Sequence, residues 1–180
     1  METEQQSLEA IHNGEQAAMR RRYDRYSGYA TAIVLRYIPE REEVRDVLQD
    51  SFVKILTGID KFRFRDEGSL KNWVSRIVVN EAIDHLRERQ NVTFADTIPD
   101  VADEELPDME DIPPEVLTEM IGRLPDNYRL VLNLFVFEQR SHREIAQLLG
   151  VKEVSSASIF FRAKRKLAKM IKEYQNKHKT

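Results

Sequence analysis

The sequence of 180 residues is long enough for one or two small domains. Its 41% apolar residues allow a hydrophobic core, and its 33% charged residues are typical of a soluble protein. It contains no cysteine, which excludes a disulfide framework and a thiolate metal site. Its four histidines are scattered, its first residues lack the apolar core of a signal peptide, and no apolar run reaches membrane-spanning length. We expect a cytoplasmic protein with no metal, no cofactor and no membrane insertion.

The net charge of −3 conceals a strong asymmetry along the chain. Counting Lys and Arg against Asp and Glu, residues 1–90 carry a net −1, residues 91–114 carry −8 and residues 115–180 carry +6. The last part therefore has the positive charge that binding to nucleic acid requires.

The first segment, residues 1–38, is expected to be helical from about Glu9 onward, with Gly14 and Gly28 as its only interruptions. It also contains a basic cluster that we interpret as a solvated face rather than a contact surface: Arg20, Arg21, Arg22 and Arg25.

A second helix is predicted after Pro39, since apolar residues recur at helical spacing there. Asp46, Gln49 and Asp50 fall together on a different face. This face is either ordinary polar surface or a docking site for a basic partner. The apolar stripe consists of Val44, Val47, Leu48, Phe52 and Ile55.

The loop from Gly58 to Ser69, GIDKFRFRDEGS, interleaves aromatic and cationic residues. Bases stack on aromatic rings while cations neutralise the phosphates, so this pattern favours a surface for single-stranded nucleic acid. The alternative, which the residues leave open, is that both phenylalanines plug the core. The residues concerned are Lys61, Phe62, Arg63, Phe64 and Arg65.

A strong helix is predicted from Leu70 to Arg89. Asn72, Arg76 and Asn80 step by four along one of its faces. Asn and Arg side chains bind base edges and phosphates, although a solvated face would use them too.

Residues 91–114 hold four of the six prolines and eight acids but no base, which predicts a flexible linker. Beyond it, Pro114 and Pro125 can each begin a helix.

The stretch from Ser141 to Leu167 predicts two helices joined by a tight turn. Ser141 and Glu144 form a capping box, and Gly150 suits the left-handed residue that ends a helix. The next helix has an apolar side and a polar side, as a helix-turn-helix requires of its recognition helix. A helical hairpin with a solvated basic face is the alternative. The polar side consists of Ser155, Ser158, Arg162, Arg165 and Lys169.

Three runs of the sequence closely resemble extracytoplasmic-function sigma factors of bacterial RNA polymerase: DVLQDSFVKIL (46–56), SLKNWVSRIVVNEAIDHLRER (69–89) and LPDNYRLVLNLFVFEQRSHREIAQLLGV followed by FRAKRKL (124–167). The resemblance implies an all-α protein with two small helical domains joined by a flexible acidic linker. Residues 1–92 would form sigma region 2, residues 93–113 the linker and residues 114–180 region 4 with its helix-turn-helix.

The resemblance also implies a function, namely a transcription initiation factor that directs core polymerase to promoters and assists promoter melting. Its partners would be the β′ clamp helices and β flap of the polymerase, promoter DNA and an anti-sigma factor. Asp46, Gln49 and Asp50 would dock on β′.

In that family the region 2 loop captures the minus-ten element, and the region 4 helix reads the minus-thirty-five element. The minus-ten residues would be Lys61, Phe62, Arg63, Phe64, Arg65, Asn72, Arg76 and Asn80. The minus-thirty-five residues would be Ser155, Ser158, Phe161, Arg162, Arg165, Lys166 and Lys169.

The recognition helix departs from the family pattern, which predicts a weak or unusual preference for upstream DNA. Val154 and Ser155 stand where a glycine and a threonine are usual, Ser156 replaces a branched apolar residue, and Ala157 and Ile159 occupy positions that are often basic. No nucleophile–base set, metal motif or phosphate loop appears, so an enzyme is not expected. The remaining alternative is a two-domain regulator that binds duplex DNA directly and dimerises through its first half.

Overall fold

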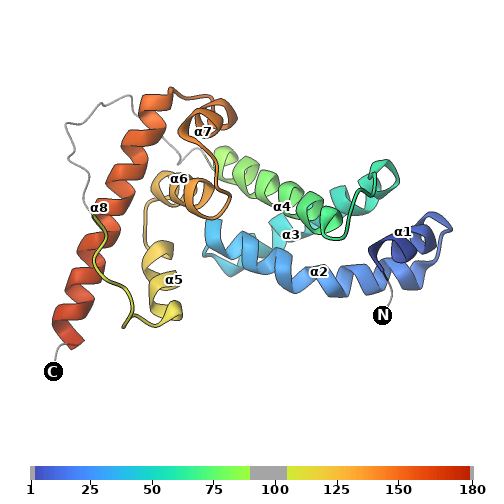
Figure 1. Ribbon diagram of the computed structural model, residues 1–180, viewed down its shortest axis with the longest axis horizontal. Helices are drawn as coiled ribbons and strands as arrows, with labels where there is room; N and C mark the ends of the chain where they lie inside the picture. The colour runs from blue at the N-terminus through green and yellow to red at the C-terminus, as the bar shows by residue number, and fades with distance from the viewer. Residues whose placement is uncertain (1–2, 90–104, 179–180) are drawn as a thin grey trace. The chain divides into compact units, whose positions relative to one another are not determined.

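The computed structural model describes residues 3–89 and 105–178, and all regular secondary structure in these residues is helical (Figure 1). The chain divides into two units, residues 1–85 and residues 86–180. The prediction of an all-α protein with two small helical parts is therefore confirmed. Most of the acidic linker lies outside the described residues.

From residue 3 onward, the first unit consists of four α-helices and one short 3₁₀-helix. These are α1 (Glu4–His12), α2 (Gln16–Tyr37), α3 (Arg41–Gly58), η1 (Ile59–Lys61) and α4 (Ser69–Glu88), which runs slightly past the division between the units. The expected interruption at Gly14 is present as the turn between α1 and α2, whereas the helix begins earlier than Glu9 and Gly28 does not interrupt α2. Gly14 permits this turn, since it adopts a φ of +82° that disfavours other residues.

The core of the first unit lies between α2, α3 and α4. Each helix contributes an apolar stripe, including Ile33, Tyr37, Val47, Leu70 and Val78, all almost inaccessible to solvent.

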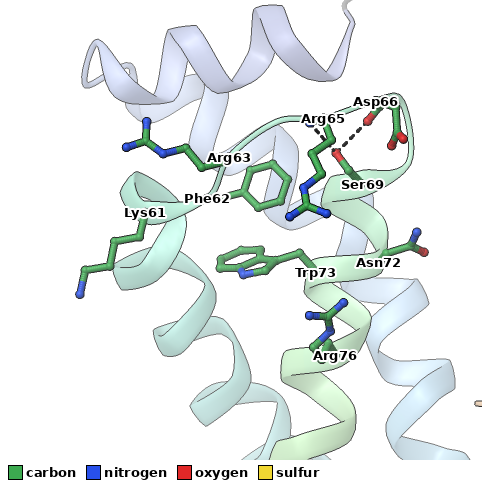
Figure 2. Close-up of a pocket in the computed structure, with 9 residues that line it drawn as sticks. All are labelled: Lys61, Phe62, Arg63, Arg65, Asp66, Ser69, Asn72, Trp73 and Arg76. Atoms are coloured by element: carbon green, nitrogen blue, oxygen red, sulfur yellow. Dashed lines mark hydrogen bonds between the residues drawn. The ribbon is translucent and has the colours of Figure 1, made fainter. Parts of the chain in front are cut away.

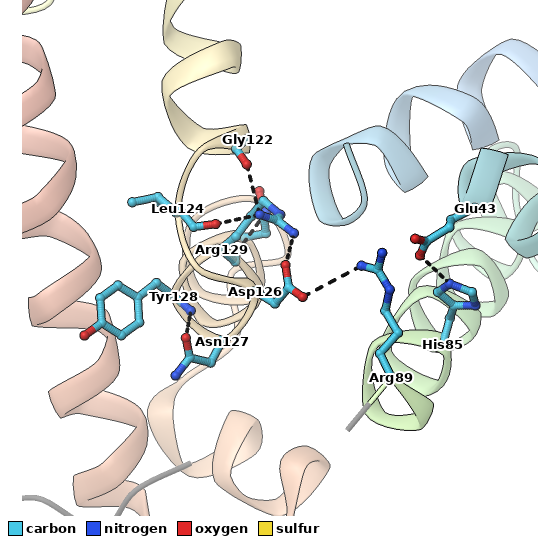
Figure 3. A network of polar contacts seen from close by, with 10 residues as sticks. Glu43, His85, Arg89, Gly122, Leu124, Asp126, Asn127, Tyr128 and Arg129 are labelled. Atoms are coloured by element: carbon cyan, nitrogen blue, oxygen red, sulfur yellow. Dashed lines mark hydrogen bonds and ion pairs between the residues drawn. The ribbon is translucent and has the colours of Figure 1, made fainter. Parts of the chain in front are cut away.

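Two contacts between polar side chains, a hydrogen bond and an ion pair, join α3 to α4. Glu43 contacts His85 at 2.8 Å (Figure 3), and Lys54 pairs with Glu81, whose hydrogen bond raises the pKa of the lysine. Their contribution to stability is small because exposed pairs are well solvated. The packing of the three helices therefore determines which residues α3 and α4 expose.

Arg22 corrects the interpretation of the basic cluster as a solvated face. It is buried, and its guanidinium donates a 2.9 Å hydrogen bond to the backbone oxygen of Glu4 and lies near the hydroxyl of Tyr26. Arg20, Arg21 and Arg25 are exposed, as expected. A buried cation needs such partners, so Arg22 belongs to the structure of the unit.

The second unit contains α5 (Pro114–Gly122), α6 (Asp126–Val136), α7 (His142–Leu149) and α8 (Glu153–His178). The predicted capping box is present, with reciprocal hydrogen bonds between Ser141 and Glu144 that also lower the pKa of the glutamate. Gly150 ends α7 in the left-handed conformation, with φ +68°. The long helix α8 packs against α6 and α7 together, so the predicted helix-turn-helix is formed.

A buried arginine organises the turn between α5 and α6 (Figure 3). Arg129 is only 2% exposed, and it donates to the carbonyl oxygens of Gly122 (3.0 Å) and Leu124 (2.7 Å) and to the carboxylate of Asp126. The two carbonyls lie at the end of α5, where helical partners are missing. Arg129 therefore satisfies backbone groups that the turn leaves open.

We predict that Arg129→Ala destabilises the second unit by about 2–4 kcal/mol, because it leaves buried acceptors and a carboxylate without their donor. The measurement is urea unfolding followed by far-ultraviolet circular dichroism. The matched control is Arg123→Ala, which removes a well-exposed arginine paired with Glu119 on the surface of the same unit. The control should change stability by no more than about 0.5 kcal/mol. Equal unfolding midpoints for the two variants would remove Arg129 from this role.

Candidate nucleic-acid interface

The loop between η1 and α4 borders a pocket of about 380 Å³ in the first unit (Figure 2). Its lining combines four cations, one carboxylate, two aromatic rings and two small polar side chains. They are Lys61, Phe62, Arg63, Arg65, Asp66, Ser69, Asn72, Trp73 and Arg76.

Two aromatic rings form the apolar part of this pocket. Phe62 and Trp73 are half-buried, with ring centroids 5.3 Å apart and planes inclined at 49°. In Figure 2 the guanidinium groups of Arg65 and Arg76 lie above and below the Trp73 ring in the view. Flat apolar surface and cations thus occur within one cavity, which suits a nucleotide base and its phosphate.

The turn that carries Arg65 is held by hydrogen bonds of the Ser69 side chain to the backbone. The Ser69 hydroxyl donates to the backbone oxygen of Asp66 at 2.7 Å and accepts from the backbone N–H of Arg65 at 3.4 Å (Figure 2). Gly68 follows in a positive φ of +98°, and its carbonyl accepts from the N–H of Asn72 at 3.0 Å. The loop therefore has a defined backbone where it meets α4.

Six of the eight predicted minus-ten residues line this one pocket. Phe64 and Asn80 do not, although Asn80 is exposed on the same face of α4 as Asn72 and Arg76. Sequence reasoning missed Asp66, Ser69 and Trp73. The sequence offers no distinct signal for Trp73, because the residue falls within the apolar periodicity of α4 and that pattern does not show that its ring stays half-exposed.

The predicted docking face lies exposed on α3. Asp46, Gln49 and Asp50 are all accessible, and Gln49 lines a surface groove of about 730 Å³. The groove also exposes apolar side chains that sequence analysis did not assign, among them Val53 (55% exposed) and Leu35. Large exposed apolar side chains beside polar ones are typical of a surface that binds another protein.

In the helix-turn-helix, the side chain of a histidine at the start of α7 contacts α8. The His142 ring stacks on Phe135 with centroids 4.6 Å apart, and its Nδ1 lies 3.1 Å from the Ser156 hydroxyl. Burial lowers the pKa of His142, which favours the neutral ring at neutral pH. Ser156, at a position where the resemblance implies a branched apolar residue, is fully buried and makes this contact.

The predicted polar side of the recognition helix needs a correction in its first two turns. Ser155 and Ser158 are each only 7% exposed, not directed to solvent. The buried side of α8 is wider than a single stripe, because the helix packs against both α6 and α7, and it also includes Ile159. Val154 is exposed instead.

Basic side chains gather farther along α8, around a groove of about 610 Å³. Arg165, Lys166 and Lys169 are exposed, whereas Arg162 and Phe161 are partly buried. Tyr128 of α6 contributes a ring to the same groove. The groove is lined by Pro125, Tyr128, Arg162, Arg165, Lys166, Lys169, Lys172, Glu173 and Asn176.

These features define a class of protein. One helical unit carries an aromatic and cationic pocket, and the other carries a helix-turn-helix with a basic helix, a combination suited to binding nucleic acid. Within residues 3–89 and 105–178, no helix is both long enough and apolar enough to cross a membrane.

Comparison with known families identifies both halves of the chain. Residues 22–92 match the model of sigma-70 region 2, and residues 115–167 match that of sigma-70 region 4. Together the two matches cover more than half of the sequence, in the order in which the family has them.

Two curated relatives agree with this assignment. The chain is 26% identical to the ECF RNA polymerase sigma factor SigM of Bacillus subtilis, covering 81% of this chain and 90% of that protein. It is 25% identical to the ECF RNA polymerase sigma-E factor of Escherichia coli, covering 90% and 91%. Among solved structures, CnrH in complex with the cytosolic domain of CnrY is 22% identical, with a TM-score of 0.47, covering 93% of this chain and 96% of that one.

The chain belongs to the sigma-70 family and is an extracytoplasmic-function sigma factor. It is an alternative sigma factor that directs RNA polymerase in transcription initiation. The family assignment sets aside the alternative of a dimeric regulator.

Proposed function

We propose that the pocket beside the loop captures an unstacked base of the non-template strand and so assists promoter melting at the minus-ten element. The single observation that carries this proposal is the pocket's composition, in which four cations surround the rings of Phe62 and Trp73. A base can stack on an aromatic surface, and the cations neutralise its phosphates.

The energetic basis is differential binding to the open strand. Unpairing and unstacking a base costs a few kcal/mol, and a pocket that accepts only the extruded base offsets that cost. The cations strengthen binding to any nearby phosphate, while Asn72 and Asn80 offer amide groups to base edges. Strand opening then needs no catalytic step from this chain, and we propose no cofactor for it.

We propose that the exposed face of Asp46, Gln49 and Asp50 docks on the β′ clamp helices of core polymerase. These residues and Val53 share one side of α3, since they are spaced by three, one and three positions. Carboxylates at the edge of an apolar groove suit a partner with basic and apolar side chains.

We predict that Asp46→Lys or Asp50→Lys sharply reduces the affinity for core polymerase while leaving unfolding within about 0.5 kcal/mol of the wild type, because both side chains are exposed. Affinity is measured by competition for fluorescently labelled core enzyme, and stability by urea unfolding. The matched control is Asp24→Lys, which reverses an exposed carboxylate on α2. If all three variants bind core polymerase alike, the α3 face is not the docking surface.

A further prediction concerns Asn80, which is exposed on α4 outside the pocket lining. We expect Asn80→Ala to reduce strand opening more than formation of the closed complex, because we assign its amide to the edge of a base that has left the duplex. Permanganate reactivity of thymines measures opening, and retention of labelled duplex measures the closed complex.

A control on the same helix separates specific recognition from general electrostatics. Lys71→Ala removes an exposed cation that lies over the Tyr29 ring, 4.6 Å from its centroid, rather than on the asparagine face. Unchanged thymine reactivity in Asn80→Ala, or an equal loss in Lys71→Ala, would contradict the assignment of Asn80.

We propose that α8 enters the major groove of the minus-thirty-five element and that the second unit also contacts the β flap. Because Ser155 and Ser158 are buried, base reading falls to the residues that follow, with Arg162 as the principal candidate and Phe161 beside it. Arg162 has reach and two parallel donors. Arg165, Lys166 and Lys169 lie farther along the helix and are assigned to phosphates.

We predict that Arg162→Ala costs about 1–3 kcal/mol of binding at the preferred upstream element and flattens discrimination there. Lys169→Ala should weaken binding to all sequences alike and reduce the slope of affinity against salt by about one unit. Both variants are titrated, as assembled holoenzyme, against the preferred site and a scrambled site across a salt series. An equal loss on both sites for Arg162→Ala would make its role electrostatic.

The remaining proposals follow from membership of the family. We propose region 2 within residues 1–92, a linker at residues 93–113 and region 4 within residues 114–180. The protein would act in the cytoplasm, where its polymerase partner works, and an anti-sigma factor would hold it silent. Capture of such a factor by the tagged chain, with displacement of core polymerase, tests the last point.

A further inference from the structure

Glu4 has an unusual position for a carboxylate near the start of a chain. It is the first residue of α1, yet it is only 5% exposed. Burial of a carboxylate is unfavourable unless hydrogen bonds replace its hydration. The region 2 match begins at residue 22, so α1 and Glu4 lie outside it.

The partners of the Glu4 carboxylate lie on α2 and in the pocket loop. Oε1 accepts a 3.1 Å hydrogen bond from the Tyr26 hydroxyl, and Oε2 accepts a 3.0 Å bond from the backbone N–H of Gly68. Burial and the adjacent carboxylate raise the pKa of Tyr26, so its hydroxyl remains a donor at neutral pH.

The backbone N–H and the backbone carbonyl of Glu4 both form hydrogen bonds. Its N–H points to the carboxylate of Glu67 at 3.3 Å, and its carbonyl oxygen accepts the 2.9 Å bond from Arg22. Glu4 therefore contacts two successive loop residues, Glu67 and Gly68, while Tyr26 and Arg22 hold it from α2.

The turn that precedes α4 connects the contacts of Glu4 to the residues that line the pocket. Gly68 directly precedes Ser69, whose hydroxyl holds the backbone of Arg65 and Asp66. Gly68 also accepts from Asn72 in the first turn of α4. Arg65, Asp66, Ser69 and Asn72 all line the pocket, so fixing Gly68 constrains four of its nine lining residues.

We propose that Glu4 is a positioning residue for the strand-capture pocket, with α1 acting as a brace that holds the loop in its binding conformation. The inference rests on the proposed function of the pocket. Glu4 itself does not line the pocket, and it acts by lowering the conformational freedom that the loop would otherwise lose on binding. Leu8 and Ile11 bury α1 independently of Glu4, so the helix can remain attached when the carboxylate is removed.

The test uses holoenzyme assembled from core polymerase and the full chain. The probe is a forked DNA whose single-stranded non-template overhang has been selected from a randomised pool by wild-type holoenzyme. Glu4→Ala should weaken binding to the fork about tenfold, because the Gly68 N–H loses its acceptor. Affinity for core polymerase and for fully duplex DNA should change less than twofold.

Two further variants control for the substitution itself. Glu9→Ala removes an exposed glutamate from the same helix and should leave fork binding unchanged. Glu4→Gln keeps the length and one acceptor oxygen, and its amide can donate to the Tyr26 hydroxyl, so it should retain most of the binding. A loss equal to that of Glu4→Ala in either control would overturn the proposal.

A double-mutant cycle distinguishes positioning from a general loss of structure. In an Arg65→Ala background, Glu4→Ala should have much less effect, because the two changes act through the same loop. Fully additive losses would overturn the proposal. If Arg65→Ala weakens fork binding and Glu4→Ala does not, the inference fails while the function of the pocket stands. If Arg65→Ala has no effect on the fork, the pocket's proposed function fails and the Glu4 inference fails with it.

Discussion

The position of the Trp73 ring is the constraint on which the first unit's binding surface depends. The ring packs over the end of α3 beside Gly58, where a Cβ added to the glycine would lie 3.4 Å from the indole, in van der Waals contact with it. The ring also contacts Phe62, with ring centroids 5.3 Å apart. One residue of α4 therefore connects the end of α3 to the loop, and the cations of the loop are arranged around that contact.

Aromatic packing also determines the arrangement of the second unit, where it holds the recognition helix in place. Its recognition helix must be held firmly while part of its surface stays available to DNA. The Phe135, His142 and Phe160 rings form a cluster between α6, α7 and α8, and Ser156 joins it through a hydrogen bond. A polar residue at this position is compatible with the fold because His142 supplies its partner. The departure of Ser156 from the family pattern is thus compensated within the core.

Charge is distributed along the chain in agreement with this division of roles. Residues 115–180 carry a net +6, concentrated on α8, whereas residues 1–90 are nearly balanced. The first unit nevertheless gathers four cations at its pocket and keeps Asp46 and Asp50 on α3. Each unit therefore presents positive charge where nucleic acid is proposed to bind, and the α3 carboxylates remain available to a protein partner.

Local sequence patterns were sufficient to predict several parts of the fold. The apolar spacing in α3 and α4, the capping box at Ser141 and the left-handed Gly150 are properties of neighbouring residues, so they can be read without knowledge of distant contacts. The same periodicity placed Asn72, Arg76 and Asn80 on one exposed face. Family resemblance supplied the biological role that these patterns alone left open.

The sequence by itself determined which segments are helical, which side of α3 and α4 is apolar, and where the basic residues gather. Only the tertiary structure decided which polar side chains face solvent. Arg22 and Ser155 resemble surface residues in a periodic pattern, but the first is enclosed by α1 and α2, and the second falls within the wide buried side of α8. The pocket and its link to Glu4 join residues 64 positions apart. Such contacts depend on how helices meet in space, and the spacing of residues within any one helix carries no information about that.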